Sequence, residues 1–317
     1  MAALRLKERY GCKVVTDIMD AWPETLLQAT PRGIENGKWR MANILLCAAG
    51  RIALRPYERM LRRACRESDA VSAQSEAFAQ FARQNGASGD IHVCYLGAER
   101  GRKAESRRKE ESGNWKLESG RKAERRSNAD NLELELPRSN SKLNLLYLGA
   151  MGRSYDLETI IKAMRLLRDQ GVAVECTFVG DGEKRARMEA EGVPGVRFTG
   201  FLSGEALEGE LKQADLGLVP FFRESGVAVP YKAGDYLAYG LPLLSTIKGE
   251  LEALINQHQC GQVYEPLNAA GLATAVRVYL DDPTRLAQAR AGARACYEER
   301  FDRGVTYPEW AEWIAEL

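Results

Sequence analysis

The sequence predicts an α/β protein with two domains, each built on a parallel β-sheet that helices cover on both faces. Short apolar runs alternate with helical patterns from Leu143 onward, which is typical of a doubly wound parallel sheet. The first hundred residues contain part of a similar pattern, and a charged segment separates the two regions. A length of 317 residues is enough for two cores of ordinary size.

Residues 1–98 contain few strands for a complete parallel sheet. After a helical opening, the strand-like run CKVVTDIMD is followed by an arginine-rich helical segment and by the strand-like runs DAVSAQS and DIHVCYLG. A parallel sheet with both faces covered usually has more strands. We therefore expect a partial first domain.

The segment 51–66, RIALRPYERMLRRACR, combines six arginines with apolar side chains. A basic amphipathic helix of this kind can lie on a surface of anionic lipid. It can equally be a solvated helix with one apolar stripe that packs on the core. The sequence leaves both alternatives open.

Residues 99–141 are expected to be a disordered insert between the domains. Glu99 to Asn131 contain eleven Lys or Arg and seven Asp or Glu, and only Trp115 and Leu117 are large and apolar. Such a composition buries too little apolar surface to offset the entropy of ordering. The similar runs GRKAESRR and GRKAERRS favour expansion of a tolerant linker over a dedicated binding arm.

Residues 142–300 are expected to form the second domain. Buried strands are indicated by the runs LNLLYLG, VECTFVG, VRFTG, DLGLVP and LPLLST, with helical patterns such as LETIIKAMRLLRD between them. The final residues 301–317 include YPEWAEWIAEL, in which Trp310 and Trp313 fall on one face of a helix. This helix can cross back to the first domain or dock on its own domain.

The composition argues against several classes of protein. A net charge of +1 provides no overall field for binding nucleic acid. The seven cysteines form no C-x-x-C pair and only two histidines are present, which argues against a zinc site and for reduced thiols in the cytoplasm. The sequence has neither an apolar run of membrane-spanning length nor a signal-peptide pattern, so we expect a soluble or peripheral protein.

Two of the expected strands end in glycine turns that lead into helices. Backbone N–H groups at the turn Gly149-Ala-Met-Gly152-Arg153, together with the Arg153 guanidinium, suit a phosphate. A purely structural turn is an equal alternative, because turns in such sheets often carry glycine. Gly180-Asp-Gly182 lacks the full G-x-G-x-x-G spacing and its acidic partner, which disfavours a dehydrogenase. For Asp181 a structural turn is the better interpretation.

The run VPYKAGDYLAYGLP, residues 229–242, places Lys232 and Asp235 three positions apart at the start of an expected helix. On one turn of a helix they share a face, toward the carboxyl ends of the strands, where ligands usually bind. A lysine suits a diphosphate, and an aspartate suits two ribose hydroxyls. The alternative is an exposed salt bridge between the two side chains.

The ordered series of motifs from residue 143 to 317 resembles the donor half of GT-B glycosyltransferases, which have two Rossmann-like domains. The likeness is to the retaining, nucleotide-sugar-dependent family 4. The motifs are a strand, Gly-Asp-Gly, VRFTGFL, ADLGLVPF, a glutamate, an acidic residue five positions before Gly-x-Pro, STIKGELEALI and CGQVYEP. VPYKAGDYLAYGLP and VVTDIMDAWPE are similar to its bacterial branch that builds surface polysaccharides and lipid-linked oligosaccharides. The likeness is thin over residues 10–97.

The resemblance implies roles for individual residues of the second domain. Gly152 and Arg153 would hold the donor diphosphate, with Lys232 beside it. Phe201 and Leu202 would lie where the base stacks.

It also implies roles for two acidic residues. Asp235 would bind the ribose, and Glu224 would be the glutamate that approaches the sugar. Glu224 and Asp235 are eleven positions apart, farther than the two acids of the family, so either a short insertion separates them or Glu224 is not the equivalent. Met19 stands where many relatives carry a histidine near the sugar.

The function implied is a hexosyl transfer from a nucleoside diphosphate sugar to a lipid-linked or polysaccharide acceptor with retention of configuration. Arg153, Lys232 and helix N-termini would stabilise the departing diphosphate, so neither a metal nor another cofactor is required. Two alternatives stay open. One is a non-catalytic or partner-dependent nucleotide-sugar-binding subunit of a split or degenerate glycosyltransferase. The resemblance implies several strands before those of residues 1–98, so the chain would then be a shortened gene product or one half of a split enzyme, and a partner could supply the missing strands. The other is a sugar-nucleotide epimerase of the same architecture.

Overall fold

A computed structural model of the chain describes residues 2–21, 37–99 and 142–317, and their side chains except those of residues 37–51. Apart from Glu99, the insert expected at 99–141 lies outside the described residues. Two parallel sheets organise the described part of the chain, one in each half. The prediction of an α/β protein with two parallel sheets is therefore confirmed.

The first domain has a three-stranded parallel sheet with the order β1-β2-β3. Its strands are β1 (Val15–Ile18), β2 (Ala70–Ala73) and β3 (Asp90–Val93), and its helices are α1 (Ala2–Tyr10), α3 (Gly37–Glu67) and α4 (Glu76–Gln84). A small core of Ile18, Cys65, Val71 and Ala82 joins the sheet to α3 and α4. In the described residues this sheet has half as many strands as the second one.

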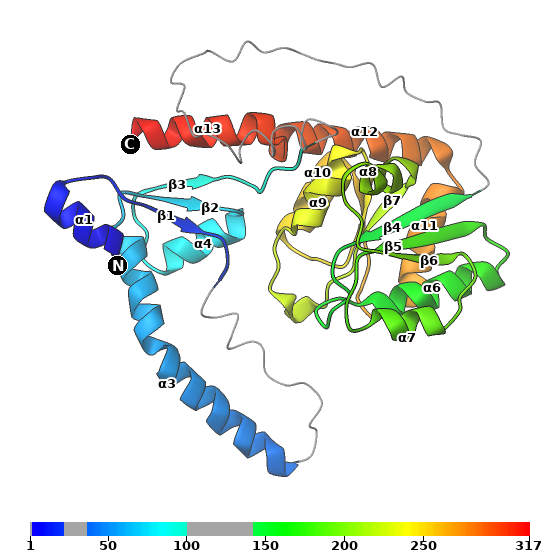
Figure 1. Cartoon of the computed structure of the whole chain (residues 1–317), viewed down its shortest axis with the longest axis horizontal. Helices are drawn as coiled ribbons and strands as arrows, with labels where there is room; N and C mark the ends of the chain where they lie inside the picture. Colours follow the sequence, from blue (N-terminus) through cyan, green and yellow to red (C-terminus); the bar gives the residue numbers. More distant parts are fainter. Residues whose placement is uncertain (1, 22–36, 100–141) are drawn as a thin grey trace.

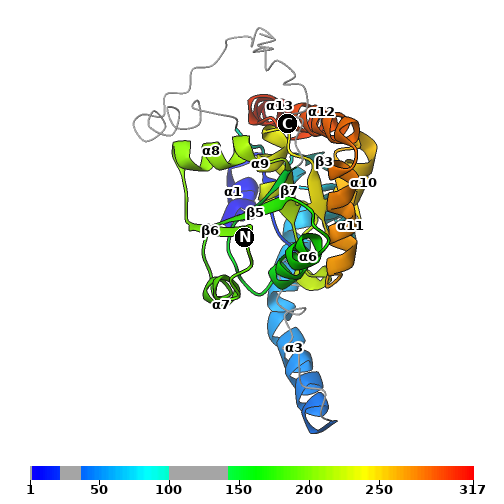
Figure 2. The ribbon, with the colours of Figure 1, turned by 90° about the vertical axis from the view of Figure 1, so that its right-hand side faces the viewer.

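The long helix α3 extends away from both domains, as Figure 1 and Figure 2 show from two sides. Near its carboxyl end, Leu61 and Cys65 pack on the core of the first domain. Toward the amino end, Tyr57 and Ile52 are exposed. The carboxyl-terminal part therefore anchors the helix to the sheet.

The second domain has a six-stranded parallel sheet with the order β6-β5-β4-β7-β8-β9. The strands are β4 (Leu143–Leu148), β5 (Val174–Val179), β6 (Val196–Gly200), β7 (Leu216–Val219), β8 (Leu243–Ser245) and β9 (Gly261–Val263). The chain runs from β4 outward to β6 and then returns to the other side of β4. The switch point, where ligands bind in sheets of this kind, thus lies between the carboxyl ends of β4 and β7.

Helices cover both faces of this sheet, and the continuous apolar runs of the strands supply two cores. In β4, Leu145 and Tyr147 face one core, and Leu146 and Leu148 face the other. The helices are α6 (Leu157–Asp169), α7 (Arg185–Ala190), α8 (Gly204–Gln213), α9 (Tyr231–Ala238), α10 (Glu250–His258), α11 (Ala269–Leu280) and α12 (Pro283–Arg300). Strand residues buried on both faces explain why the sequence runs are apolar without alternation.

The last helix, α13 (Arg303–Glu316), lies against the first domain although it follows α12 of the second (Figure 1). The indole nitrogen Nε1 of Trp310 donates to Ser72 Oγ at 2.9 Å, and Nε1 of Trp313 donates to Asp90 Oδ2 at 2.6 Å. The Trp313 ring also stacks on His92 at 4.8 Å. Both tryptophans therefore hold α13 to β2 and β3.

The chain passes between the domains twice, and the two crossings run side by side. The N–H of Ala98 donates to Phe301 O at 2.8 Å, and the N–H of Arg303 donates to Ala98 O at 3.3 Å. A Cβ at Gly97 would lie 2.8 Å from Arg303 Cα, so glycine is required for this close approach. The two crossings form one narrow connection.

Three further findings concern the described residues. No helix within them is long and apolar enough to cross a membrane. They contain no group of three or more His, Cys, Asp or Glu side chains that could hold a metal ion. The six cysteines whose side chains are described form no disulfide: Cys12, Cys65, Cys94, Cys176, Cys260 and Cys296.

Candidate functional site

Two glycine turns meet backbone to backbone at the carboxyl ends of β4 and β5. The N–H of Gly149 donates to Val179 O at 2.9 Å, and the N–H of Met151 donates to Asp181 O at 2.8 Å. A Cβ at Gly180 would overlap the carbonyl oxygen of Gly149. Glycine is therefore needed at position 180 for these two turns to pack against each other. This requirement agrees with the interpretation of Asp181 as part of a structural turn.

Lys232 lies in the first turn of α9, and its ammonium is buried beneath the β4 turn. The residue is 8% exposed. Its Nζ lies 4.3 Å from the ring centroid of Tyr147, 4.1 Å from that of Tyr155 and 5.2 Å from that of Phe221. These three rings form an aromatic cage, which attracts a cation through the electron-rich ring faces. A Cβ at Gly149 would lie 3.2 Å from the same Nζ.

No atom of the described residues accepts a hydrogen bond from the Lys232 ammonium. Burying a cation without hydrogen bonds disfavours its charged form. Burial accordingly lowers the pKa of Lys232 to about 7, and the charge of Asp235 opposes that shift. The site thus contains a cation that gains stability from an anionic partner.

Asp235 lies one turn further along α9, and its side chain reaches the surface although protein atoms surround the carboxyl closely enough to desolvate it in part. The surrounding protein raises the pKa of its carboxyl by desolvation, and the charge of Lys232 lowers it by less. Among the described side chains Lys232 and Asp235 form neither a hydrogen bond nor an ion pair with each other, and Lys232 is buried. The alternative of an exposed salt bridge between them is therefore wrong.

Arg153 lies at the end of the β4 turn, with its side chain 90% exposed. Its Nε donates to Glu183 Oε1 at 3.1 Å, across to the turn that follows β5. The neighbouring Gly152 has an ordinary φ, and a Cβ there would have no atom within 4 Å. Neither backbone strain nor packing within the described residues requires glycine at this position, so its backbone is open to approach.

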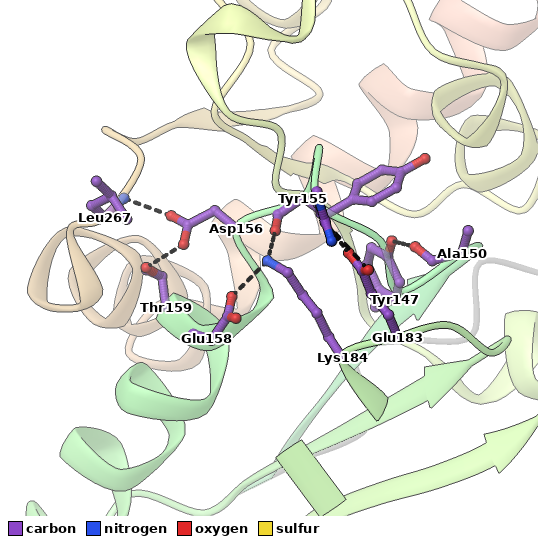
Figure 3. A network of polar contacts seen from close by, with 10 residues as sticks. Tyr147, Ala150, Tyr155, Asp156, Glu158, Thr159, Glu183, Lys184 and Leu267 are labelled. Atoms are coloured by element: carbon purple, nitrogen blue, oxygen red, sulfur yellow. Dashed lines mark hydrogen bonds and ion pairs between the residues drawn. The ribbon is translucent and has the colours of Figure 1, made fainter. Parts of the chain in front are cut away.

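A polar network fixes the start of α6 behind this turn (Figure 3). Asp156 is 1% exposed, and its Oδ2 accepts from the N–H of Leu267 at 2.5 Å. Lys184 Nζ donates to Tyr155 O at 2.7 Å and to Glu158 Oε2 at 2.9 Å. Figure 3 also shows Tyr147 donating to Ala150 O, at 2.6 Å. The cage and the glycine turn are thus held as one unit.

The remaining predicted residues lie around this centre at the carboxyl edge of the sheet. Glu224 lies in a short 3-10 helix, η1 (Arg223–Ser225), after β7 and is exposed. A loop with Gly226 in the left-handed region (φ 67°) leads from it to α9. This loop and the first residues of α9 separate Glu224 from Asp235 along the chain.

Phe201 and Leu202 follow β6, which is the edge strand of the sheet. Phe201 is 82% exposed, and Leu202 is partly buried against the core. Leu202 also lines a hollow of about 460 Å³ between β6 and α8. The lining residues are Arg197, Phe198, Thr199, Leu202, Glu205, Ala206, Gly209, Glu210 and Gln213. Lys232 and the glycine turns do not line this hollow.

Sequence reasoning missed the three aromatic rings, Asp156 and Lys184. Tyr147 lies in an apolar strand, and Tyr155 and Phe221 follow different strands, so no sequence motif joins them. The position of Tyr155 directly after the glycine turn was the one available signal.

Residues 142–282 match the family Glycosyl transferases group 1. Among curated relatives, 183 residues are 25% identical to the amylovoran biosynthesis glycosyltransferase AmsK of Erwinia amylovora, covering 55% of this chain and 45% of that protein. A glycogen synthase of Mycobacterium tuberculosis is 32% identical over 164 residues, covering 50% of this chain and 39% of that protein. The match thus spans less than half the length of each of these relatives.

The fold of the described residues is GT-B. Anabaena HepE, solved in complex with UDP-glucose, superimposes with a TM-score of 0.62 and 17% sequence identity. The superposition covers 99% of this chain and 75% of HepE. The structural likeness therefore includes both parallel sheets. The family match of residues 142–282, in contrast, includes only the sheet of the second domain.

Proposed function

We propose that the chain is a retaining glycosyltransferase that moves a hexosyl group from a nucleoside diphosphate sugar to a lipid-linked or polysaccharide acceptor. The observation that carries this proposal is the buried Lys232 ammonium, which lies beneath the glycine turn after β4 and has no hydrogen-bond partner in the described part of the chain. It lies at the switch point between β4 and β7, where sheets of this kind bind ligands.

A diphosphate suits this place because it supplies the anionic oxygens that the site lacks. Lys232 would contact it from below, and the exposed Arg153 would add a guanidinium at the rim of the same turn. Gly152, which no packing constraint requires, would let the phosphates approach the backbone. Binding of an anion would also favour the protonated form of Lys232.

The other predicted residues complete the donor site in this proposal. Asp235, on the same helix as Lys232, would accept hydrogen bonds from the ribose hydroxyls. Phe201 and Leu202 would contact the base, and Glu224 would approach the sugar.

In the proposed reaction the bond between the anomeric carbon and the diphosphate breaks, and a bond from that carbon to the acceptor oxygen forms. The proton of the acceptor hydroxyl passes to an oxygen of the departing diphosphate, so atoms and charges balance. Lys232 and Arg153 would stabilise the negative charge that develops on the diphosphate. This electrostatic role needs no metal ion.

The relatives favour a uridine nucleotide and a glycan product. HepE is solved with UDP-glucose, and AmsK is named for amylovoran biosynthesis. Both curated relatives are named as a glycosyltransferase or a synthase. The alternative of a non-catalytic or partner-dependent nucleotide-sugar-binding subunit is therefore not favoured.

The proposal includes a contact between α3 and anionic lipid on the cytoplasmic side of a membrane, where a lipid-linked acceptor would be reached. Arginines recur along α3 at spacings of three and four, so they share one face: Arg55, Arg59, Arg62, Arg63 and Arg66. Tyr57 and Met60 lie on other faces and are exposed. Tyr57 lies one helical turn before Leu61, which packs on the core of the first domain. The apolar face that includes Leu61 therefore extends to exposed residues of α3.

A thermal-shift screen of the whole chain with UDP, GDP, ADP and their sugars tests the donor site. A ligand at a hundred times its dissociation constant adds about 2.7 kcal/mol to the folded state. We expect a selective rise of Tm with uridine nucleotides. A well-folded sample that responds to none of them contradicts the proposal, and release of an epimerised sugar from donor alone would favour the epimerase.

A further inference from the structure

Glu250 is the first residue of α10 in the second domain, and its carboxylate contacts the first domain. Its Oε1 accepts from the backbone N–H of Glu76 at 2.7 Å, and its Oε2 accepts from that of Ala77 at 2.9 Å. The phenol of Tyr95 also donates to Oε1, at 2.7 Å. Because Glu76 and Ala77 are the first two residues of α4, a side chain of the second domain caps a helix of the first domain.

The amino end of α4 depends on this carboxylate for two of its N–H groups. The first N–H groups of a helix have no partner within the helix. In α4, Ser75 Oγ accepts from the N–H of Phe78 at 3.2 Å, and Glu250 accepts from those of Glu76 and Ala77. A carboxylate is favoured here because the helix dipole places partial positive charge at this end.

The second domain holds Glu250 in place. Leu251, Leu254 and Ile255 of α10 are buried in the core on one face of the six-stranded sheet. Gly249, just before the helix, has a φ of 82°, which favours glycine. Because α10 follows the loop after β8, its amino end lies at the carboxyl edge of the sheet. The first domain is thus held against the edge that carries Lys232.

Tyr95 strengthens this contact from the crossing segment. Its side chain is buried and packs beside Phe301 with ring centroids 5.3 Å apart. Burial, followed by the hydrogen bond to Glu250, raises the pKa of the phenol far above its usual value. The phenol therefore stays protonated and donates to the carboxylate.

The two chain crossings alone do not fix the angle between the domains. They run side by side, where Ala98 pairs with Phe301 and Arg303, and a narrow connection of this kind can act as a hinge. Interfaces between domains of one chain are commonly small enough to allow relative motion. The hydrogen bonds of Glu250 to α4 lie outside the crossings, so opening at the hinge would break them.

We propose that Glu250 is a latch that holds the two domains closed over the candidate donor site by capping α4 across the domain boundary. It is a positioning residue, since its carboxylate contacts Glu76, Ala77 and Tyr95 and would act on the reaction through the first domain. Its role in the reaction rests on the proposed function, but the latch itself does not.

The test compares Glu250→Ala and Glu250→Gln with Glu252→Ala in the full chain. Glu252 lies in the same helical turn, and its Oε2 faces the N–H of its own helix start at Gly249 (3.4 Å), so it is a control that does not cross the boundary. Amide hydrogen exchange resolved to single residues reports the cap of α4. Small-angle X-ray scattering reports the separation of the domains through the radius of gyration.

For Glu250→Ala we expect exchange at Glu76 and Ala77 to rise roughly tenfold or more, because two charge-assisted hydrogen bonds are lost. The amide of Phe78, which Ser75 caps, should change less, and the radius of gyration should increase. Glu252→Ala should leave both readouts as in the wild type. Glu250→Gln should shift both in the same direction by less, and it serves as the test if the alanine variant does not fold.

Unchanged exchange at Glu76 and Ala77 would overturn the proposal, because the contact would then be absent in solution. Faster exchange without a change in the radius of gyration would also overturn it, since Glu250 would then be only a local cap. UDP affinity is measured separately by thermal shift and should be unchanged, whereas kcat/KM for the acceptor reaction should fall. Absence of nucleotide binding in the wild type would refute the proposed function and leave the latch untouched.

Discussion

The ammonium of Lys232 lies 4.1 Å from the ring centroid of Tyr155, although Tyr155 follows β4 and Lys232 lies in the first turn of α9. Tyr147 and Phe221 close the cage from two further elements. Aromatic faces attract a cation but offer it no hydrogen bond. Structures seldom leave a buried charge in this state, because the unmet hydrogen bonds reduce the stability of the fold.

Replacing Lys232 by methionine should therefore have opposite effects on folding and on binding. Lys232→Met removes a buried cation to which the described residues offer no hydrogen bond, and it keeps most of the apolar stem, so we expect an unchanged or higher Tm in the absence of ligand. The same change should abolish the rise of Tm with nucleotide. Lys212→Met, at an exposed position paired with Glu208 on α8, is the control and should leave both unchanged. A large loss of ligand-free stability in Lys232→Met would argue for a structural role of the lysine.

The stability of the wild type should rise with pH between about 7 and 10.5 because of Lys232, whose pKa burial lowers from 10.5 to about 7. In this window the unfolded state binds the proton and the folded state has lost it, so alkali favours the folded state. Below pH 7 both states are protonated and this group adds no slope. The expected slope approaches about 1.4 kcal/mol per pH unit within the window. Urea denaturation of the wild type and Lys232→Met at pH 6, 7.5 and 9 should show it as a difference between the two proteins.

The sheets and the cage differ in how far the sequence could predict them. The strands of the second domain are apolar on both faces, so their runs predict a buried parallel sheet directly. The sequence also predicted that Lys232 and Asp235 share one helix, and both lie in α9. The cage was missed because Tyr147 and Phe221 come from strands that are distant in sequence, and their packing depends on the order β4-β7.

The contact of Glu250 with α4 was hidden for a related reason. STIKGELEALI indicates a helix start, and a glutamate at such a start ordinarily stabilises the amino end of its own helix. Only the position of the first domain brings Ala77 to this carboxylate. Contacts between domains depend on the tertiary arrangement, for which a single sequence carries no periodic signal.

Asp235→Asn should weaken nucleotide binding by about 1 to 3 kcal/mol, as expected when a charged acceptor of hydrogen bonds is lost. Isothermal titration with UDP and with uracil, which has no ribose, measures the effect. If Asp235 binds the ribose, the variant should lose affinity for UDP. Asp281→Asn, at the exposed end of α11, should have no effect. Equal affinity of Asp235→Asn and the wild type for UDP would remove the ribose assignment.

Flotation with lipid vesicles should show whether α3 contacts a membrane surface. We expect the wild type to float with vesicles that contain phosphatidylglycerol and not with phosphatidylcholine alone. Replacing Arg55, Arg59 and Arg62 by glutamine should weaken this binding by about 1 kcal/mol per arginine at low salt. These side chains carry the charge of the exposed face of α3.

The matched control for flotation replaces Arg165, Arg168 and Arg277 of the second domain by glutamine, which changes the net charge equally. It should float like the wild type if α3 provides the contact. Equal losses in the two triple variants would indicate a general charge effect. Absence of flotation at low salt would leave α3 as a helix whose apolar stripe serves only the core around Leu61 and Cys65.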